Sequence, residues 1–202
     1  MLQGCLMFPR DDFAEFVGIV IGDGNLYDKG PTYVEICGDP VLDFDFMSSL
    51  RSRLERFGFR PKMTIREGGL RLRINNKKLV EDLKNIGMPS GREKCTESKI
   101  PKIFLKEWSL TKKCIRGVFD TDGCIFYDKR RIYRTPYVRI CLHMKNRKLL
   151  KQIQKILATK SIEARINTDG YNLSINGRTQ VNKFLKNIGF SNKRHIERVM
   201  PQ

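Results

Sequence analysis

The sequence repeats itself once, and this duplication constrains the fold more than any other feature. The stretch RLRINNKKLVEDLKNIGM (Arg71–Met88) returns as NLSINGRTQVNKFLKNIGF (Asn172–Phe190), and both copies contain Ile-Asn followed by Leu-Lys-Asn-Ile-Gly. Upstream, Gly18–Tyr27 aligns with Gly117–Phe126 in the same order and spacing. The repeated unit is about 100 residues long, and two copies are too few for a solenoid. We therefore expect a monomer with internal pseudo-twofold symmetry, divided into halves at residues 1–99 and 100–202.

Each half has the same predicted order of elements: helix, two strands, helix, two strands, helix. The apolar spacing predicts helices at 12–22, 42–57, 77–86, 110–121, 148–160 and 179–188, and strands at 33–37, 62–66, 70–74 and 137–142, with a hairpin at 164–175. Asp12 and Glu15 form a capping-box pattern at the start of the first helix. A linker is expected at 88–106, where Pro89, Gly91 and Pro101 occur. This is an α+β pattern with antiparallel sheets.

The first helix of each half carries small residues four positions apart. They are Gly18 and Gly22 in one copy and Gly117 and Thr121 in the other. Glycine inside a helix costs about 1 kcal/mol relative to alanine, so a packing reason is expected. Small residues at this spacing let two helices approach backbone to backbone. We infer that the two helices pack on each other at the pseudo-twofold axis.

An Asp-Gly dipeptide ends each of these helices, at Asp23 and Asp122. One such dipeptide is an ordinary helix-ending turn. Two of them at matching repeat positions, each behind a small-residue stripe, are instead brought together at one end of the helix pair. Neighbouring carboxylates raise each other's pKa unless cations lie between them, and hard divalent ions with oxygen ligands meet that need.

The charge of the chain points to a polyanionic partner. Lys and Arg number 39 against 22 Asp and Glu, which gives a formal net charge of +17. Such a surface favours binding to nucleic acid, because its contacts with phosphates release counterions. Charge alone does not distinguish a DNA-binding protein from a ribosomal or other RNA-associated one.

The remaining composition excludes several classes of protein. The six cysteines form no Cys-x-x-Cys pair and the sequence has two histidines, so a structural zinc site is not expected. No segment approaches the length and apolarity of a membrane span, and the first residues lack a leader pattern. We expect a cytoplasmic protein that makes no contact with a membrane.

The two helix ends resemble the signature of a known family. FVGIVIGDG (Phe16–Gly24) and IRGVFDTDG (Ile115–Gly123) are similar to the nine-residue motif of the LAGLIDADG homing endonucleases, in the monomeric two-motif class. The motif's third-position Gly, eighth-position Asp and closing Gly are present in both copies. Ile21 at position six of the first copy and Arg116 at position two of the second depart from the pattern.

The resemblance implies a fold and an activity. The implied fold is a saddle of two four-stranded antiparallel sheets in the DNA major groove, with the paired helices at its centre. The implied activity, typical of intron-encoded members, is hydrolysis of one phosphodiester in each strand of a long, imperfectly palindromic double-stranded DNA target. Asp23 and Asp122 would bind Mg²⁺, for which Mn²⁺ can substitute, with help from the carbonyls of Gly22 and Thr121. A lysine near each site is also implied, at Lys94 and Lys193.

The strand pattern supports groove binding independently. In the first half Leu70, Leu72 and Ile74 alternate with polar residues, which places the polar side chains on the opposite face. Arg and Asn read guanine and adenine edges, and Glu35 is the one residue that contradicts the pattern. The side chains expected to contact DNA are Lys62, Thr64, Arg66, Arg71, Arg73 and Asn75, and in the second half Arg139, Arg165, Asn167, Asn172 and Ser174.

Two alternatives stay open. The first is a nuclease-dead DNA- or RNA-binding protein on the same scaffold, such as a transcription regulator or an intron maturase. The second is an RNA-structural protein explained by its charge alone, in which Asp23 and Asp122 would lie far apart. An intein is not expected, because the sequence shows no His-Asn splice junction after Val199.

Overall fold

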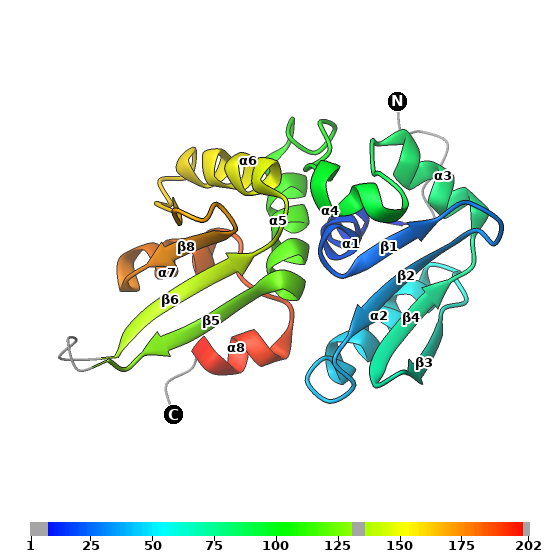
Figure 1. The fold of residues 1–202 in the computed structure, drawn as a ribbon, viewed down its shortest axis with the longest axis horizontal. Helices are drawn as coiled ribbons and strands as arrows, with labels where there is room; N and C mark the ends of the chain where they lie inside the picture. The colour runs from blue at the N-terminus through cyan, green and yellow to red at the C-terminus, as the bar shows by residue number, and fades with distance from the viewer. Residues whose placement is uncertain (1–7, 131–135, 200–202) are drawn as a thin grey trace.

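The computed structural model describes residues 8–130 and 136–199. Within these ranges the chain forms two similar halves on either side of a central pair of helices, with one sheet in each half (Figure 1). The sheets have the strand orders β1-β2-β4-β3 and β5-β6-β8-β7, and all neighbouring strands are antiparallel. The predicted α+β class with two four-stranded antiparallel sheets is confirmed.

The elements follow one another in the same order in both halves. The first half contains α1 (Arg10–Gly22), β1 (Gly24–Tyr27), β2 (Tyr33–Gly38), α2 (Phe44–Arg56), β3 (Lys62–Arg66), β4 (Gly69–Ile74) and α3 (Lys77–Asn85). A short 3-10 turn, η1 (Gly91–Glu93), and α4 (Lys94–Glu97) lead to the second half. That half contains α5 (Trp108–Asp122), β5 (Gly123–Asp128), β6 (Tyr137–His143), α6 (Arg147–Ala158), β7 (Arg165–Ile166), β8 (Asn172–Asn176), α7 (Arg178–Asn187) and α8 (Lys193–Val199).

Each sheet buries one face and leaves the other to polar residues. Leu70, Leu72 and Ile74 alternate along β4 and are at most 1% exposed, as are Leu173 and Ile175 of β8. The helices that cover these apolar faces contact the inner strands: α2 meets β4, α3 meets β2, α6 meets β8 and α7 meets β6. The period-two alternation therefore decides which face of each sheet stays open.

Helices α1 and α5 pack so closely that a side chain has no room at the crossing. A methyl group on Gly18 would overlap the carbonyl oxygen of Cys114, and one on Gly117 would overlap that of Glu15. One turn further on, a methyl group on Gly22 would overlap the Thr121 hydroxyl. The structure thus brings the four small residues of the two stripes together in one helix interface.

A buried charge cluster crosses the same interface. Glu15 is 1% exposed, accepts a hydrogen bond from Arg116 Nη2 at 2.7 Å and lies 3.6 Å from Lys113 Nζ. Its other oxygen accepts from the Ser191 hydroxyl at 2.9 Å and lies 3.5 Å from Arg53 Nη1. Burial acts to raise the pKa of Glu15, but Arg116 and Arg53 outweigh it and lower the pKa. Glu15 therefore binds the halves together as an anion.

The capping prediction for α1 is wrong. The helix begins at Arg10 behind Pro9, whose carbonyl accepts from Phe13 N–H at 2.9 Å, and no side chain caps it. Asp12 consequently lies inside the first turn and Glu15 is drawn into the interface. Strands β1 and β5 were predicted by the order of elements but given no bounds, and the short helices α4 and α8 were not predicted. No helix of the described residues is long and apolar enough to span a membrane.

Candidate functional site

Asp23 and Asp122 lie at the same end of the helix pair. Asp23 is the C-cap of α1, where its N–H donates to Ile19 O at 3.1 Å, and Asp122 is the last residue of α5. A Cβ built on Gly22 would lie 3.3 Å from Asp122 Oδ2, so the second carboxylate reaches across the interface to the end of α1. The small residues that let the helices approach also bring the two acids together.

The two carboxylates hold their protons more tightly than exposed ones. Burial raises the pKa of Asp23 to about 6, and the nearby Asp43 adds to this effect while Lys94 and Arg194 oppose it. Burial and the charge of Asp23 raise the pKa of Asp122 to about 7, against the opposing effects of Lys94 and His143. Such a pair favours a cation between its members once it ionises.

Lys94 belongs to this site. It is the first residue of α4, and its Nζ donates to the carbonyl of Gly22, the residue before Asp23. Burial lowers the pKa of Lys94, while Asp122 and Asp23 act to raise it. The lysine predicted at this position is therefore in contact with the first Asp-Gly turn and within electrostatic reach of both carboxylates.

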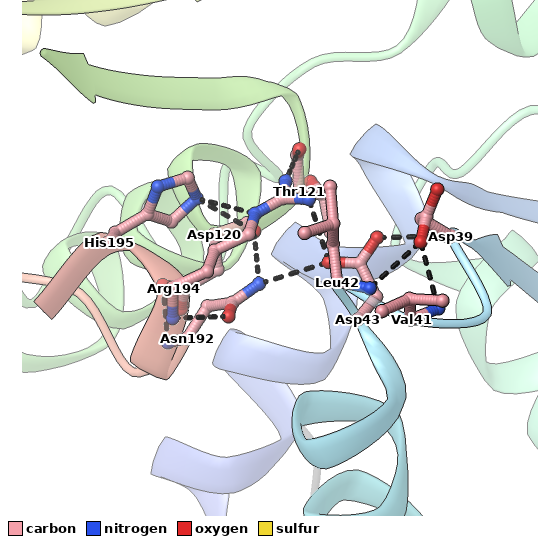
Figure 2. A network of polar contacts seen from close by, with 9 residues as sticks. All are labelled: Asp39, Val41, Leu42, Asp43, Asp120, Thr121, Asn192, Arg194 and His195. Carbon is pink, nitrogen blue, oxygen red and sulfur yellow. Dashed lines mark hydrogen bonds and ion pairs between the residues drawn. The ribbon is translucent and has the colours of Figure 1, made fainter. Parts of the chain in front are cut away.

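Lys193 does not join the site. Its side chain is 71% exposed, and its Nζ lies 3.7 Å from Asp45 on α2. The next residue, Arg194, donates from Nη2 to the carbonyl of Thr121 at 3.1 Å and pairs through Nη1 with Asp43 at 2.8 Å (Figure 2). Because Thr121 precedes Asp122 as Gly22 precedes Asp23, Arg194 is the counterpart of Lys94. The basic run that contains both residues identified the segment but not the member that points inward.

A buried polar network fixes Arg194 in place (Figure 2). Asp120 is fully buried and accepts from the N–H groups of Ser191 at 2.8 Å and Asn192 at 2.9 Å. Asn192 immediately precedes α8, and its Nδ2 donates to Asp120 O at 3.1 Å and to Asp43 Oδ1 at 3.3 Å. Burial raises the pKa of Asp120 to about 6 despite these bonds. The start of α8 is thus tied to both α5 and the N-terminal half.

The oxygen donors at this end of the helix pair suit a hard divalent cation. Two carboxylates and the carbonyls of Gly22 and Thr121 converge here, and Mg²⁺ completes such a partial set with water. Those carbonyls accept hydrogen bonds from Lys94 and Arg194 in this structure. No cluster of three or more His, Cys, Asp or Glu side chains that could hold a metal ion occurs in the described parts of the chain.

The side chains expected to contact DNA lie on the open faces of the two sheets. In the first sheet, Lys62 pairs in register with Arg73 and Thr64 with Arg71, and Arg66 follows along β3. In the second, Arg139 pairs with Asn176, and Ser174 pairs with both Cys141 and Arg165. Of the eleven residues, Ser174 is the least accessible at 8% exposed; Asn75 and Asn167 lie just beyond strand ends. The same faces carry residues that were not predicted to contact DNA: Asn25, Tyr27, Tyr33, Cys37, Phe126, Tyr137 and His143.

Relatives by sequence match the chain as one segment of longer proteins. Residues 110–189 match the model of the LAGLIDADG-like domain. A replication factor C small subunit of Thermococcus kodakarensis is 27% identical over 95% of this chain and 21% of its own length. A reverse gyrase of Methanocaldococcus jannaschii is 28% identical over 73% of this chain and 8% of its own length. The chain thus spans about a fifth of these relatives or less.

Solved structures share the fold across both halves. Mesophilic variants of the homing endonuclease I-DmoI superpose with a TM-score of 0.61 at 18% identity, covering 89% of this chain and 96% of that one. The homing endonuclease I-WcaI bound to its DNA recognition sequence gives 0.66 at 10% identity, covering 96% and 88%. Full-length WhiA from Thermatoga maritima gives 0.60 at 15% identity, covering 98% and 62%. Residues 110–189 are therefore a LAGLIDADG-like domain, and the chain has the duplicated fold of the monomeric two-motif LAGLIDADG homing endonucleases.

Proposed function

We propose that the protein is a site-specific double-stranded DNA endonuclease that hydrolyses one phosphodiester in each strand with divalent metal ions. One observation carries the proposal: two carboxylates with raised pKa values, Asp23 and Asp122, meet at the end of a helix pair between two sheets with basic open faces. The net charge of +17 supports a nucleic-acid partner. I-DmoI, which shares the fold, has been crystallised with DNA and Ca and with DNA and Mn.

The residues of each half are proposed to act on one strand of the DNA. Asp23 and Asp122 would hold Mg²⁺ or Mn²⁺, which supplies Lewis-acid stabilisation of the charge that develops on the reacting phosphate. Lys94 and Arg194, each bonded to the carbonyl before one of the acids, place one positive charge beside each scissile phosphate. The open sheet faces position the duplex in the major groove, and the halves 1–99 and 100–202 each serve one strand within a monomer.

A second function is favoured by one feature of the site. The carbonyls of Gly22 and Thr121, proposed as metal ligands, are already satisfied by Lys94 and Arg194. A protein of this fold that binds DNA or RNA without cutting it would have no need to release them. In the nuclease, Lys94 and Arg194 would share these carbonyls with the metal, since a carbonyl oxygen has two lone pairs, or would move away from them.

Cleavage of a plasmid library that carries randomised inserts separates the two functions. With Mg²⁺ the wild-type chain is expected to linearise a subset of plasmids, whereas EDTA or the double variant Asp23→Asn with Asp122→Asn abolishes cutting. Gel-shift binding to the same library provides the parallel readout. A wild-type chain that binds selected inserts and never nicks them in Mg²⁺ or Mn²⁺ would disprove the nuclease and establish the binding protein.

A further inference from the structure

A carboxylate lies in the middle of the basic open face of the first sheet. Glu35 of β2 is 4% exposed and lies between Arg71 and Arg73 of β4. Its Oε2 accepts from Arg73 Nε at 2.9 Å and Nη2 at 2.7 Å, and its Oε1 accepts from Arg71 Nη1 at 3.2 Å. A negative charge on a surface that faces phosphates weakens binding, so this position calls for a compensating role.

The two arginines are held in different ways. Arg73 uses Nε and one Nη2 hydrogen for Glu35, and its guanidinium lies 4.2 Å from the centre of the Tyr33 ring. Tyr33 in turn stacks on Tyr27 with ring centres 4.3 Å apart. The hydrogen bonds to Glu35 leave both Nη1 hydrogens and the second Nη2 hydrogen of Arg73 for a ligand, and its side chain is 39% exposed.

Both Nη groups of Arg71 already have carboxylate partners. Nη1 donates to Glu35 and Nη2 donates to Glu67 at 3.1 Å, and Nε is buried without a hydrogen-bond partner. The paired Nη edge that would bind a base is therefore occupied by two carboxylates. Arg71 balances the charge of Glu35, and Arg73 keeps the fork that matches the O6 and N7 atoms of guanine.

The second sheet has no such arrangement at the equivalent place. Gly24 pairs with Ile36 in the first sheet and Gly123 pairs with Leu142 in the second, so the register places Cys141 where Glu35 stands. Ser174 pairs with Cys141 as Arg73 pairs with Glu35. The second sheet carries its carboxylate elsewhere: Asp128, the last residue of β5, lies 2.7 Å from Arg130 Nη2 and 3.2 Å from Arg139 Nη2. The two surfaces therefore differ at the position of Glu35.

We propose that Glu35 is a positioning residue that holds Arg73 in one orientation, so that the first sheet reads guanine at one base pair of the target while Arg71 supports the clamp. The inference rests on the proposed DNA-binding function. Glu35 itself does not read a base, because it is almost fully buried and both of its oxygens are engaged. A fixed guanidinium loses less conformational entropy on binding a base than a mobile one.

Selection of bound sequences from a randomised duplex pool in EDTA tests this inference without requiring cleavage. The wild-type chain is expected to enrich guanine at one half-site position by about tenfold or more, the discrimination of one bidentate contact. Arg73→Lys, which keeps the charge and loses the fork, should abolish that preference. Glu35→Gln should reduce it at the same position, with preferences elsewhere unchanged. Cys141→Ser, at the equivalent place in the other sheet, should leave it intact.

The outcomes separate the inference from the function on which it rests. A wild-type chain that enriches no sequence overturns both. A chain that enriches a site, but keeps the guanine preference in Arg73→Lys or loses it in Cys141→Ser, overturns the inference alone. Uniformly weaker binding of Glu35→Gln to all sequences would assign the residue a structural role and also overturn it. If Glu35→Gln does not fold, judged by thermal melting, Arg73→Lys and Cys141→Ser still decide.

Discussion

The carboxylates at the end of the helix pair should make the metal-free protein less stable at neutral pH. Burial and the neighbouring Asp23 raise the pKa of Asp122 to about 7, against 3.8 for an exposed aspartate. Because the folded chain binds this proton more tightly than the unfolded chain does, the free energy of unfolding falls as the pH rises from about 4 to about 7. Asp122→Asn removes the ionisation and should therefore stabilise the protein above pH 7.

The pKa shift sets the size of this effect. Three pKa units correspond to about 4 kcal/mol at about 1.4 kcal/mol per unit. Lys94 loses a partner in the variant, which offsets part of the gain. We expect Asp122→Asn to raise the free energy of unfolding by about 2 to 4 kcal/mol at pH 8, and by less than about 1 kcal/mol at pH 4.

Urea denaturation in EDTA at pH 4 and pH 8 measures both values. Asp169→Asn is the control of opposite sign, since hydrogen bonds from the Tyr171 N–H and from Asn172 lower the pKa of Asp169. Removing that carboxylate should destabilise the protein at pH 8 relative to pH 4. Equal effects of Asp122→Asn at the two pH values, or a loss of stability at pH 8, would refute the reasoning.

Three further predictions concern the helix interface and the two half-sites. Gly18→Ala should destabilise the protein by about 3 kcal/mol in thermal or urea melts despite a helix-propensity gain of about 1 kcal/mol, because the methyl group meets the Cys114 backbone; an unchanged melt contradicts this. Asp23→Asn should convert the nuclease into an enzyme that nicks supercoiled target plasmid; full linearisation contradicts separate half-sites. Arg194→Met should slow nicking of one strand at least about tenfold, and Lys193→Met should not, in strand-specific end-labelled assays.

Much of the fold could be predicted from the sequence because the two halves can be compared with each other. An ambiguous apolar run in one half is resolved by its copy in the other, and the alternation along Gly69–Ile74 gives the buried face directly. The start of α1 was mispredicted because a short acidic pattern was read locally. Asp12 and Glu15 satisfy the spacing of a capping box, but the ion pairs of Glu15 involve Lys113 and Arg116, far away in sequence.

The candidate site could also be predicted only in part. Asp23 and Asp122 could be identified because each occupies the eighth position of the nine-residue motif, and that motif is local in the sequence. Choosing between Lys193 and Arg194 requires the rotation of α8, which is set by the bonds of Asn192 to Asp120 and Asp43. Those partners lie in other segments, so no pattern within the basic run contains the answer. Glu35 is a different case. In the sequence it contradicts the basic pattern of the sheet face, and in the structure it binds two arginines of that face.

The charge cluster around Glu15 affects which half-domains can pair with each other. At the equivalent position the other copy carries Cys114, and Arg116 is matched by Val17. Two first halves assembled alone would bury two Glu15 carboxylates at their crossing without Arg116, and two second halves would bury two Arg116 side chains without a carboxylate. In the first case each Glu15 would keep only Arg53, and in the second each Arg116 would lack its carboxylate partner at the interface. Separately expressed halves should therefore favour the mixed pair over either symmetric dimer.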